Sequence, residues 1–420
     1  MRRLKIGYFA DGIWAHNAFR KIIESKRFEI CFVTPRFDST DNTLLELSRA
    51  HNIPCIKAKD INSSAFFSQI THFNCDIFVS MSFNQIFKEP LISTPRLKTI
   101  NCHAGKLPFY RGRNILNWVL INDEKDFGIT VHFVDSGIDS GDIILQRSFP
   151  ISDSDDYSTL LHTAHTQCAQ ILYDALCLLQ EDKATPIKQD SIHKVGFYCP
   201  ARVSGDEWIN WHKSSREIFN FIRALNAPDL GAKSLVINPL RPQNTSTMRI
   251  FKAQMIESAP DYIATPGAIV GIEHIESSLD SIHAQSNTAN KINGVSLIES
   301  SAQSHTSRQI AAHTSQHTAR QKSYIVKTLD STLRVVSYEC ERALRIGDRL
   351  LSHYLTGGGK TKDFKHPFSI PLHFLFLHSL YWYFASLERL LSFYFFYSCI
   401  FYAYFYLLLR IFAPSLSHSP

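Results

Sequence analysis

The chain has 420 residues, of which 12% are aromatic, and a formal net charge of +6 at pH 7. This length predicts about two to three domains with ample core. So small a positive excess makes no obvious stripe for tracking phosphates, which argues against a general nucleic-acid-binding protein. The N-terminus lacks the long apolar stretch of a secretory signal, so we expect a cytoplasmic protein.

Nine cysteines are spread along the chain without a CxxC pair or zinc-like spacing. We interpret them as reduced thiols that mostly fill the core, and we expect no metal site. They are Cys31, Cys55, Cys75, Cys102, Cys168, Cys177, Cys199, Cys340 and Cys399.

The first 80 residues alternate between strand-like and helix-like patterns. This rhythm predicts an α/β domain built on a doubly wound, mostly parallel sheet. Asp11-Gly12 reads as a tight strand-to-helix turn rather than a phosphate loop, because no GxGxxG accompanies it. The predicted strands cover 6–10, 29–33 and 76–80, and the predicted helices cover 14–25 and about 42–50.

A polar motif follows this pattern. Asn101 ends the strand-like run 97–100, and His103 lies two residues later. Asp139 follows the predicted strand 128–134 in a glycine-punctuated loop, 36 positions after the histidine (139 − 103). Reacting groups in open α/β sheets gather where strands end. A buried Asp beside a His keeps the imidazole charged and oriented, and an Asn amide donates to an oxygen that becomes negative.

This set of side chains suits attack of an amine on a carbonyl-like carbon. Taken singly, each residue has a simpler reading as a strand cap or a turn residue. Cys102 lies inside the motif, but alternation along the strand should point it away from its two neighbours, so we expect no catalytic role for it.

The pattern Asn101-x-His103, Leu107-Pro108 and Asp139-x-Gly-Asp resembles that of the folate-dependent formyltransferase family. The resemblance covers residues 4–230 and extends less clearly to 355. It implies a Rossmann-like catalytic domain over 1–200 and transfer of a formyl group from 10-formyltetrahydrofolate to a primary amine through a tetrahedral intermediate. By this resemblance, Asn101 and His103 stabilise the oxyanion. Asp139 holds His103 and helps the proton leave the attacking nitrogen.

The family's pterin-binding loop corresponds in position to residues 83–87. In relatives the backbone of this loop pairs with the pterin ring, and residues 135–138 would form the second wall. Ordinary core packing is an equally good reading of the apolar members of the loop. The folate-binding residues implied are Phe83, Gln85, Ile86, Phe87, Asp135 and Gly137.

Two helices are predicted in the middle of the chain. Apolar spacing over 156–182 indicates a long amphipathic helix packed on the sheet. Residues 208–225 resemble the family's linker to a small β-barrel, and Ser214 with Glu217 forms a capping box that should start a helix. Trp208 and Trp211 could stack on the acceptor, but hydrophobic packing is favoured.

A second domain is predicted over 201–355, comprising the linker helix and a small open, OB-like β-barrel. Strand-like pieces lie at 248–253, 268–272, 324–327, 333–338 and 345–350. Residues 263–323 contain no aromatic residue, and such a stretch cannot bury enough apolar area to offset its ordering entropy. We therefore expect a disordered insertion over 274–322, with solvated histidines rather than metal ligands.

The C-terminal tail, 366–412, is rich in aromatic residues and helical in its expected structure. Residues 390–409 form twenty positions without a charge, half of them Phe or Tyr. That length can span a bilayer, but Tyr prefers the interface. Three interpretations stay open. The tail could be an interfacial anchor, through peripheral membrane contact of 367–412, a helix packed on the protein or a partner, or an extension without selected function.

The motif following Arg111 bears on the acceptor. Residues 111–118 are similar to nucleotide-sugar N-formyltransferases that act on amino-deoxy sugars. Residues 34–42, where enzymes for initiator methionyl-tRNA usually carry a basic loop, are short and not basic here. A nucleotide-linked amino sugar is therefore the favoured acceptor, with methionyl-tRNA as the alternative. An inactive formyltransferase fold used for interaction is a second alternative, and a homodimer is left open.

Overall fold

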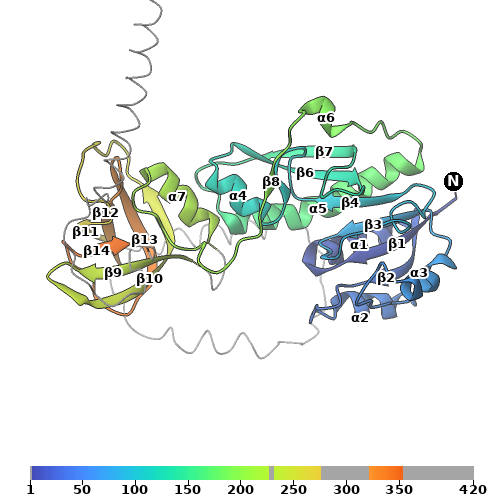
Figure 1. Cartoon of the computed structure of the whole chain (residues 1–420), viewed down its shortest axis with the longest axis horizontal. Helices are drawn as coiled ribbons and strands as arrows, with labels where there is room; N and C mark the ends of the chain where they lie inside the picture. The colour runs from blue at the N-terminus through green and yellow to red at the C-terminus, as the bar shows by residue number, and fades with distance from the viewer. Residues whose placement is uncertain (1, 227–230, 276–320, 353–420) are drawn as a thin grey trace, which may run out of the picture. The chain divides into compact units, whose positions relative to one another are not determined.

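The computed structural model describes residues 2–226, 231–275 and 321–352, and the fold is given for these ranges (Figure 1). A six-stranded sheet forms its N-terminal part, in the order β2-β1-β3-β4-β6-β7. Strands β2, β1, β3 and β4 pair in parallel, whereas β4–β6 and β6–β7 pair antiparallel. The strands are β1 Leu4–Ala10, β2 Phe28–Thr34, β3 Ile77–Met81, β4 Thr99–His103, β6 Asp126–Phe133 and β7 Ile143–Pro150.

The sheet is therefore mixed: the three pairings among β2, β1, β3 and β4 are parallel, as predicted, and the two pairings of β6 are antiparallel. Strands β6 and β7 follow each other through the loop 134–142 as a hairpin, which makes them antiparallel to each other and adds them beside β4. Because β4 and β6 are antiparallel, the end of β6 lies beside the beginning of β4, with Phe133 opposite Ile100, and the loop 134–142 then brings Asp139 to Asn101 and His103.

Apolar side chains cover both faces of the sheet. Tyr8 of β1 packs into a cluster with residues of α1, α4 and α5, whereas the next residue, Phe9, packs into a second cluster with α3 and the segment 83–92. This alternation follows from the period of two along a strand. The helices of this part are α1 Gly12–Ser25, α2 Thr43–Ala50, α3 Ser64–Thr71, α4 Ile115–Ile121 and α5 Tyr157–Gln180.

Helix α5 confirms the long amphipathic helix predicted over 156–182. Its N-terminus is fixed by a capping box, in which the Asp156 carboxylate accepts from the Thr159 N–H at 3.0 Å and the Asp156 N–H donates to the Thr159 hydroxyl at 3.1 Å. One face of the helix is buried against the sheet from Leu160 to Leu176. Helix α5 is thus a rigid backing for the strands that carry the polar motif.

Helix α7, Ser215–Ala224, is the predicted linker helix. Ser214 and Glu217 form the capping box that the sequence indicated, with the Ser214 hydroxyl accepting from the Glu217 N–H. Two arginines tie the helix to the N-terminal part. The Arg216 Nη1 atom donates to Asp153 at 2.7 Å, and the Arg223 Nη1 atom donates to the Ser152 carbonyl at 2.6 Å. Trp211 is buried and donates to the Ser234 hydroxyl at 3.0 Å, so this tryptophan serves packing, as favoured.

A second six-stranded sheet is antiparallel, in the order β11-β12-β13-β10-β9-β14. A bridge between Ala268 and Arg349 links its two outer strands, so the sheet curls on itself. The curled sheet agrees with an open barrel, whereas the OB-like topology stays a prediction. Strand β9 was not predicted. The strands are β9 Ala232–Asn238, β10 Arg241–Met255, β11 Ile269–Ile275, β12 Gln321–Lys327, β13 Thr332–Cys340 and β14 Arg349–Leu351.

The predicted insertion, 274–322, is shorter than expected at both ends. His274 pairs with Lys322 and Ile275 with Gln321, which extends the β11–β12 ladder into it. The interior, 276–320, and the tail, 366–412, lie outside the described residues. Among the helices of the described ranges, none is both long and apolar enough to cross a bilayer.

Candidate active site

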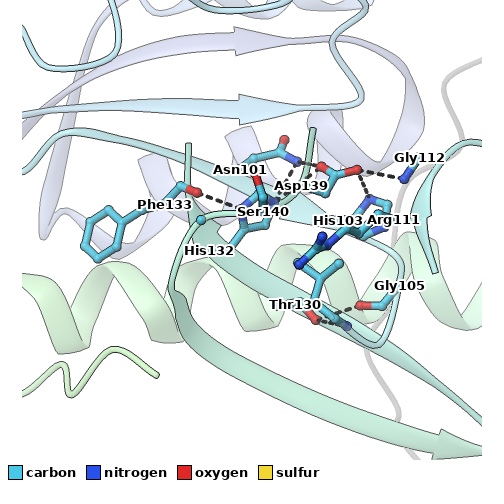
Figure 2. A network of polar contacts seen from close by, with 12 residues as sticks. Asn101, His103, Gly105, Arg111, Gly112, Thr130, His132, Phe133, Asp139 and Ser140 are labelled. Carbon is cyan, nitrogen blue, oxygen red and sulfur yellow. Dashed lines mark hydrogen bonds and ion pairs between the residues drawn. The ribbon is translucent and has the colours of Figure 1, made fainter. Parts of the chain in front are cut away.

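The three predicted catalytic residues lie together at the carboxyl end of β4 (Figure 2). The Asn101 Nδ2 atom is 3.4 Å from Asp139 Oδ1, and the His103 Nδ1 atom is 3.7 Å from Asp139 Oδ2. Asn101 lies inside the strand rather than at its end, because β4 continues through His103. The two side chains therefore share one face of the strand, two residues apart.

The Asp139 carboxylate is held in its ionised form. Burial by itself raises the pKa of this carboxyl, but the charge of His103 and the hydrogen bond and charge of His132 lower it, as does the Gly112 N–H. The favourable contacts outweigh burial, and the pKa of Asp139 lies well below its ordinary value. The Gly112 N–H donates to Asp139 Oδ2 at 2.9 Å. A fixed negative charge therefore lies between two imidazoles.

His103 is oriented from both sides of its ring. Its Nε2 atom is 2.7 Å from the Tyr110 carbonyl oxygen. Because a carbonyl only accepts, Nε2 carries a hydrogen, and Nδ1 is the nitrogen that faces Asp139. An imidazolium would satisfy both contacts. Gly105 makes this approach feasible, because a Cβ atom there would collide with the His103 ring and the Tyr110 carbonyl.

The donor to Asp139, Gly112, is positioned by a short parallel pairing. Strands β5, Arg111–Gly112, and β8, Tyr198–Cys199, bring the segment after α6, Gln189–Ile192, to the site. Gly112 has a φ of 98°, which an L side chain rarely adopts, and a Cβ atom there would collide with the Cys199 carbonyl. Glycine is therefore the residue that lets this N–H reach the carboxylate.

His132 of β6 is a site residue that the sequence reading missed. Its Nδ1 atom faces the Phe133 carbonyl at 2.7 Å, and its Nε2 atom lies 3.3 Å from Asn101 Nδ2 and 3.5 Å from Asp139 Oδ1 (Figure 2). The His132 side chain is 2% exposed. The sequence signal that could have found it is a histidine in the strand that leads to Asp139, two residues after Thr130 and therefore on the same face of that strand. His132 thus links the amide and the carboxylate.

We expect His132→Ala to lower turnover by about 10- to 100-fold, because a hydrogen bond to a charged group contributes about 1.5–3 kcal/mol. Loss of His132 also removes one of the contacts that lower the pKa of Asp139. That pKa should rise, so as pH falls, activity that needs the carboxylate should disappear at a higher pH than in the parent. The measurement is kcat/KM as a function of pH. His212→Ala, at an exposed position, is the control, and an unchanged acid limb with parental turnover would exclude His132 from the site.

The site opens into a cavity of about 1040 Å³. Asn101, His103 and Asp139 line it, and so do all six residues expected to contact folate. Ile86 and Ile138 also line the cavity and are 60% and 51% exposed, respectively. Exposed apolar side chains at a concave polar site are typical of a ligand-binding wall. Further residues line the cavity, among them Arg36 and Arg113 and four that the sequence analysis assigned to no site, namely Trp14, Tyr157, Tyr198 and Arg202.

The side chains of the two cavity-lining loops mostly hold the loops in place. Phe83 and Phe87 pack edge-on against Phe9, which fits the core-packing reading. Gln85 accepts from the Ile61 N–H and donates to the Ala58 carbonyl, both at 3.0 Å. The Asp135 carboxylate accepts from the Ser140 hydroxyl at 2.6 Å and from the Gly137 N–H at 3.0 Å. Any folate contact from these residues would therefore fall mainly to the loop backbone.

Cys102 points away from the polar cluster, as predicted. Its thiol lies 3.7 Å from the Cys168 carbonyl on α5, on the opposite face of β4 from Asn101 and His103. Across the described ranges, no group of three or more His, Cys, Asp or Glu side chains is arranged to hold a metal ion.

Comparison with known proteins identifies two matching family models. The one described as formyl transferase matches residues 24–176, and the one described as formyl transferase, C-terminal domain, matches residues 203–279. The chain is 31% identical over 225 residues to the methionyl-tRNA formyltransferase of Pelobacter propionicus, which covers 54% of this chain and 66% of that protein. The match therefore spans just under two thirds of that relative.

A second relative and one solved structure extend the comparison. The methionyl-tRNA formyltransferase of Alkaliphilus oremlandii is 30% identical over 228 residues, covering 54% of this chain and 70% of that protein. A crystal structure of a sugar 3N-formyltransferase, determined in the presence of dTDP and 5-N-formyl-THF, aligns with a TM-score of 0.51. That alignment covers 82% of this chain and 100% of the other at 19% identity, a level that speaks to the fold alone.

Proposed function

Since the chain belongs to the formyltransferase family, we propose that it transfers a formyl group from 10-formyltetrahydrofolate to a primary amine. The observation that carries this proposal is the contact of one Asp139 carboxylate with Asn101, His103 and His132 at the wall of the large cavity. These are the groups that an acyl transfer to an amine requires: a donor for the oxygen, a polarised imidazole and a fixed negative charge.

The cavity suits a folate. Its lining includes the apolar residues Ile86 and Ile138 and the continuous segment 82–87, whose backbone groups would pair with a flat heterocycle. The Asn84 Oδ1 atom is buried with no hydrogen-bond partner among the described residues, whereas its Nδ2 atom donates to Asp38. A ring that carries N–H donors would satisfy this acceptor.

The residues divide the work of the transfer. The folate supplies the formyl carbon and takes up a proton on the nitrogen that it releases. Asn101 would donate to the formyl oxygen as the amine adds and that oxygen becomes negative, with His103 as a second, cationic stabiliser. The two contacts of the Asn101 amide nitrogen, 3.3 and 3.4 Å, are long, so the amide can turn toward the substrate. Asp139 would help the proton leave the attacking nitrogen.

For the acceptor, we propose an amino sugar on a nucleotide. Arg113 and Arg202 line the same cavity as the catalytic residues. The Arg202 Nη1 atom is buried with no hydrogen-bond partner in the described part of the chain, and burial lowers the pKa of this guanidinium more than the nearby charges of Asp206 and Glu207 raise it. A phosphate oxygen would provide both a hydrogen-bond acceptor and a compensating charge. A diphosphate-linked sugar supplies such an oxygen close to its amine.

Methionyl-tRNA is the second candidate acceptor, favoured by the activity named for the P. propionicus and A. oremlandii relatives. Against it stands the loop after β2. There Arg36 is engaged with Asp38 at 3.1 Å and with Asp11 at 3.9 Å, so its charge is largely neutralised by carboxylates. A surface that holds tRNA phosphates needs unpaired positive charge.

The test is incubation of the chain with 10-formyltetrahydrofolate and either a panel of amino-sugar nucleotides or methionyl-tRNA, with products identified by mass. We expect a formylated sugar whose formation changes little between about 50 and 200 mM salt, because a diphosphate displaces few counterions. A tRNA acceptor with six or more phosphate contacts would instead lose about a thousandfold in affinity over that range.

The outcomes separate the candidates. Efficient formylation of methionyl-tRNA with a steep salt dependence and no sugar product would overturn the sugar assignment and leave formyl transfer in place. No formyl transfer to any acceptor, together with no saturable folate binding by fluorescence, would support the inactive, interaction-only fold.

A further inference from the structure

Gln189 is a buried glutamine, 3% exposed, that connects three separate segments of the chain. Its Nε2 atom donates to the Asp139 carbonyl at 2.9 Å and to the Gly141 carbonyl at 2.7 Å. Its Oε1 atom accepts from Arg111 Nε at 3.0 Å and from Arg111 Nη2 at 2.6 Å. Neither the catalytic motif nor the cavity lining includes this residue.

The orientation of the Gln189 amide is fixed by its partners. Arg111 can only donate, and the two carbonyls can only accept, so the amide oxygen must face Arg111 and the nitrogen must face the loop. Two N–H groups and two lone pairs are all that a glutamine side chain has, and all four are used. Gln189 therefore has no remaining capacity to bind a substrate, and its role must lie in what it holds together.

The two segments that Gln189 joins are those that place the catalytic carboxylate. On one side, Asp139 itself has a φ of 51°, in the left-handed region, and Gly141 lies directly against the Phe133 carbonyl. On the other side, Arg111 precedes Gly112, whose N–H donates to the Asp139 carboxylate. Gln189 thus spans from the backbone of the carboxylate residue to the neighbour of its N–H donor.

We propose that Gln189 is a positioning residue for formyl transfer, which fixes the Asp139 carboxylate against Gly112, His103 and His132. This inference rests on the proposed function, because its kinetic test measures formyl transfer. Without the two hydrogen bonds to the loop, Asp139 is free to leave its left-handed conformation, and its carboxylate then moves away from both imidazoles. Gln189 acts through Asp139 and touches no reacting atom.

Gln180 provides a matched control at a distance from the site. On α5, its Oε1 atom accepts from Arg27 Nε at 3.1 Å and from Arg27 Nη2 at 2.8 Å. Its Nε2 atom donates to the Arg2 carbonyl at 3.2 Å and to the Arg27 carbonyl at 3.3 Å. The pattern of two arginine donors and two carbonyl acceptors is the same as that of Gln189, but none of its partners belongs to the cavity.

The experiment compares Gln189→Met with Gln180→Met in the full chain. Methionine keeps the length of the side chain and removes every hydrogen bond. We expect both variants to bind folate within severalfold of the parent, and Gln189→Met alone to lose at least about tenfold in kcat with KM for the acceptor little changed. Gln189→Glu keeps the acceptor for Arg111 but turns an oxygen against two carbonyls, so its kcat should fall further.

A second measurement is independent of turnover. The ¹⁵N chemical shifts of the His103 and His132 rings report their contacts with Asp139, and they should change in Gln189→Met and stay parental in Gln180→Met. Parental kcat and parental ring shifts in Gln189→Met would overturn the proposal, as would failure of both Gln189 variants to fold. If the parent transfers no formyl group but the ring shifts still change in Gln189→Met, the proposed function is rejected and the positioning role of Gln189 is kept.

Discussion

Replacement of His103 or Asp139 by Ala is expected to lower kcat by at least about a hundredfold while the affinity for folate stays within severalfold. His103→Ala removes the imidazole proposed to stabilise the formyl oxygen, and Asp139→Ala removes the carboxylate that lies 3.7 Å from that ring. His103 lies outside the segments expected to contact the pterin, 83–87 and 135–138, and Asp139 directly follows the second of them. Steady-state formylation and fluorescence titration with folate measure the two quantities separately.

Asp126→Ala is a matched control for these variants. Asp126 starts the same strand, β6, that leads to Asp139, but its carboxylate pairs with Lys106 at 2.7 Å and is 40% exposed. Its removal should leave kcat unchanged. Near-parental turnover in either His103→Ala or Asp139→Ala would remove that residue from the mechanism.

Asn101→Asp is expected to be more damaging than Asn101→Ala. Loss of one oxyanion donor costs about 10²–10³ in kcat, which is the expectation for Ala. The Asp variant has nearly the same shape, but it puts a negative charge beside the developing oxyanion and next to Asp139 Oδ1, which is 3.4 Å from the amide nitrogen in the parent. Lowering the pH should protonate the new carboxyl, which is raised in pKa by its neighbour, and recover activity toward that of the Ala variant.

The measurement for this series is kcat against pH for both variants. Asn74→Asp makes the same exchange at an exposed position and should behave as the parent. Equal activity of Asn101→Asp and Asn101→Ala at every pH would show that no negative charge develops near residue 101 in the rate-limiting step.

Local patterns in the sequence were sufficient for the capping box of Ser214 and Glu217, for the extent of α5, and for the convergence of Asn101, His103 and Asp139. Each of these depends on residues close in sequence, or on the general rule that reacting groups lie where strands end. The extents of α5 and α7 agree closely with the ranges expected from apolar spacing and caps.

His132 and Gln189 depend on relations that no local pattern contains. His132 meets Asn101 because β4 and β6 pair antiparallel in the register that sets these two residues opposite each other. A shift of one residue would have turned the histidine to the other face. Gln189 reaches Asp139 over 50 residues of sequence, through a short helix without strong periodicity. The antiparallel hairpin of β6 and β7 was not predicted for the same reason, because the direction of a strand in a sheet depends on tertiary pairing.

A carbonyl oxygen does not accept a proton at neutral pH, and the Tyr110 carbonyl occupies the Nε2 atom of His103. The ring therefore exchanges protons through Nδ1 alone. His103 therefore cannot take up a proton at one ring nitrogen and release it at the other. A proton that reaches His103 has to leave by the same atom, to Asp139 or to the cavity, so the ring cannot pass a proton from one side of the site to the other.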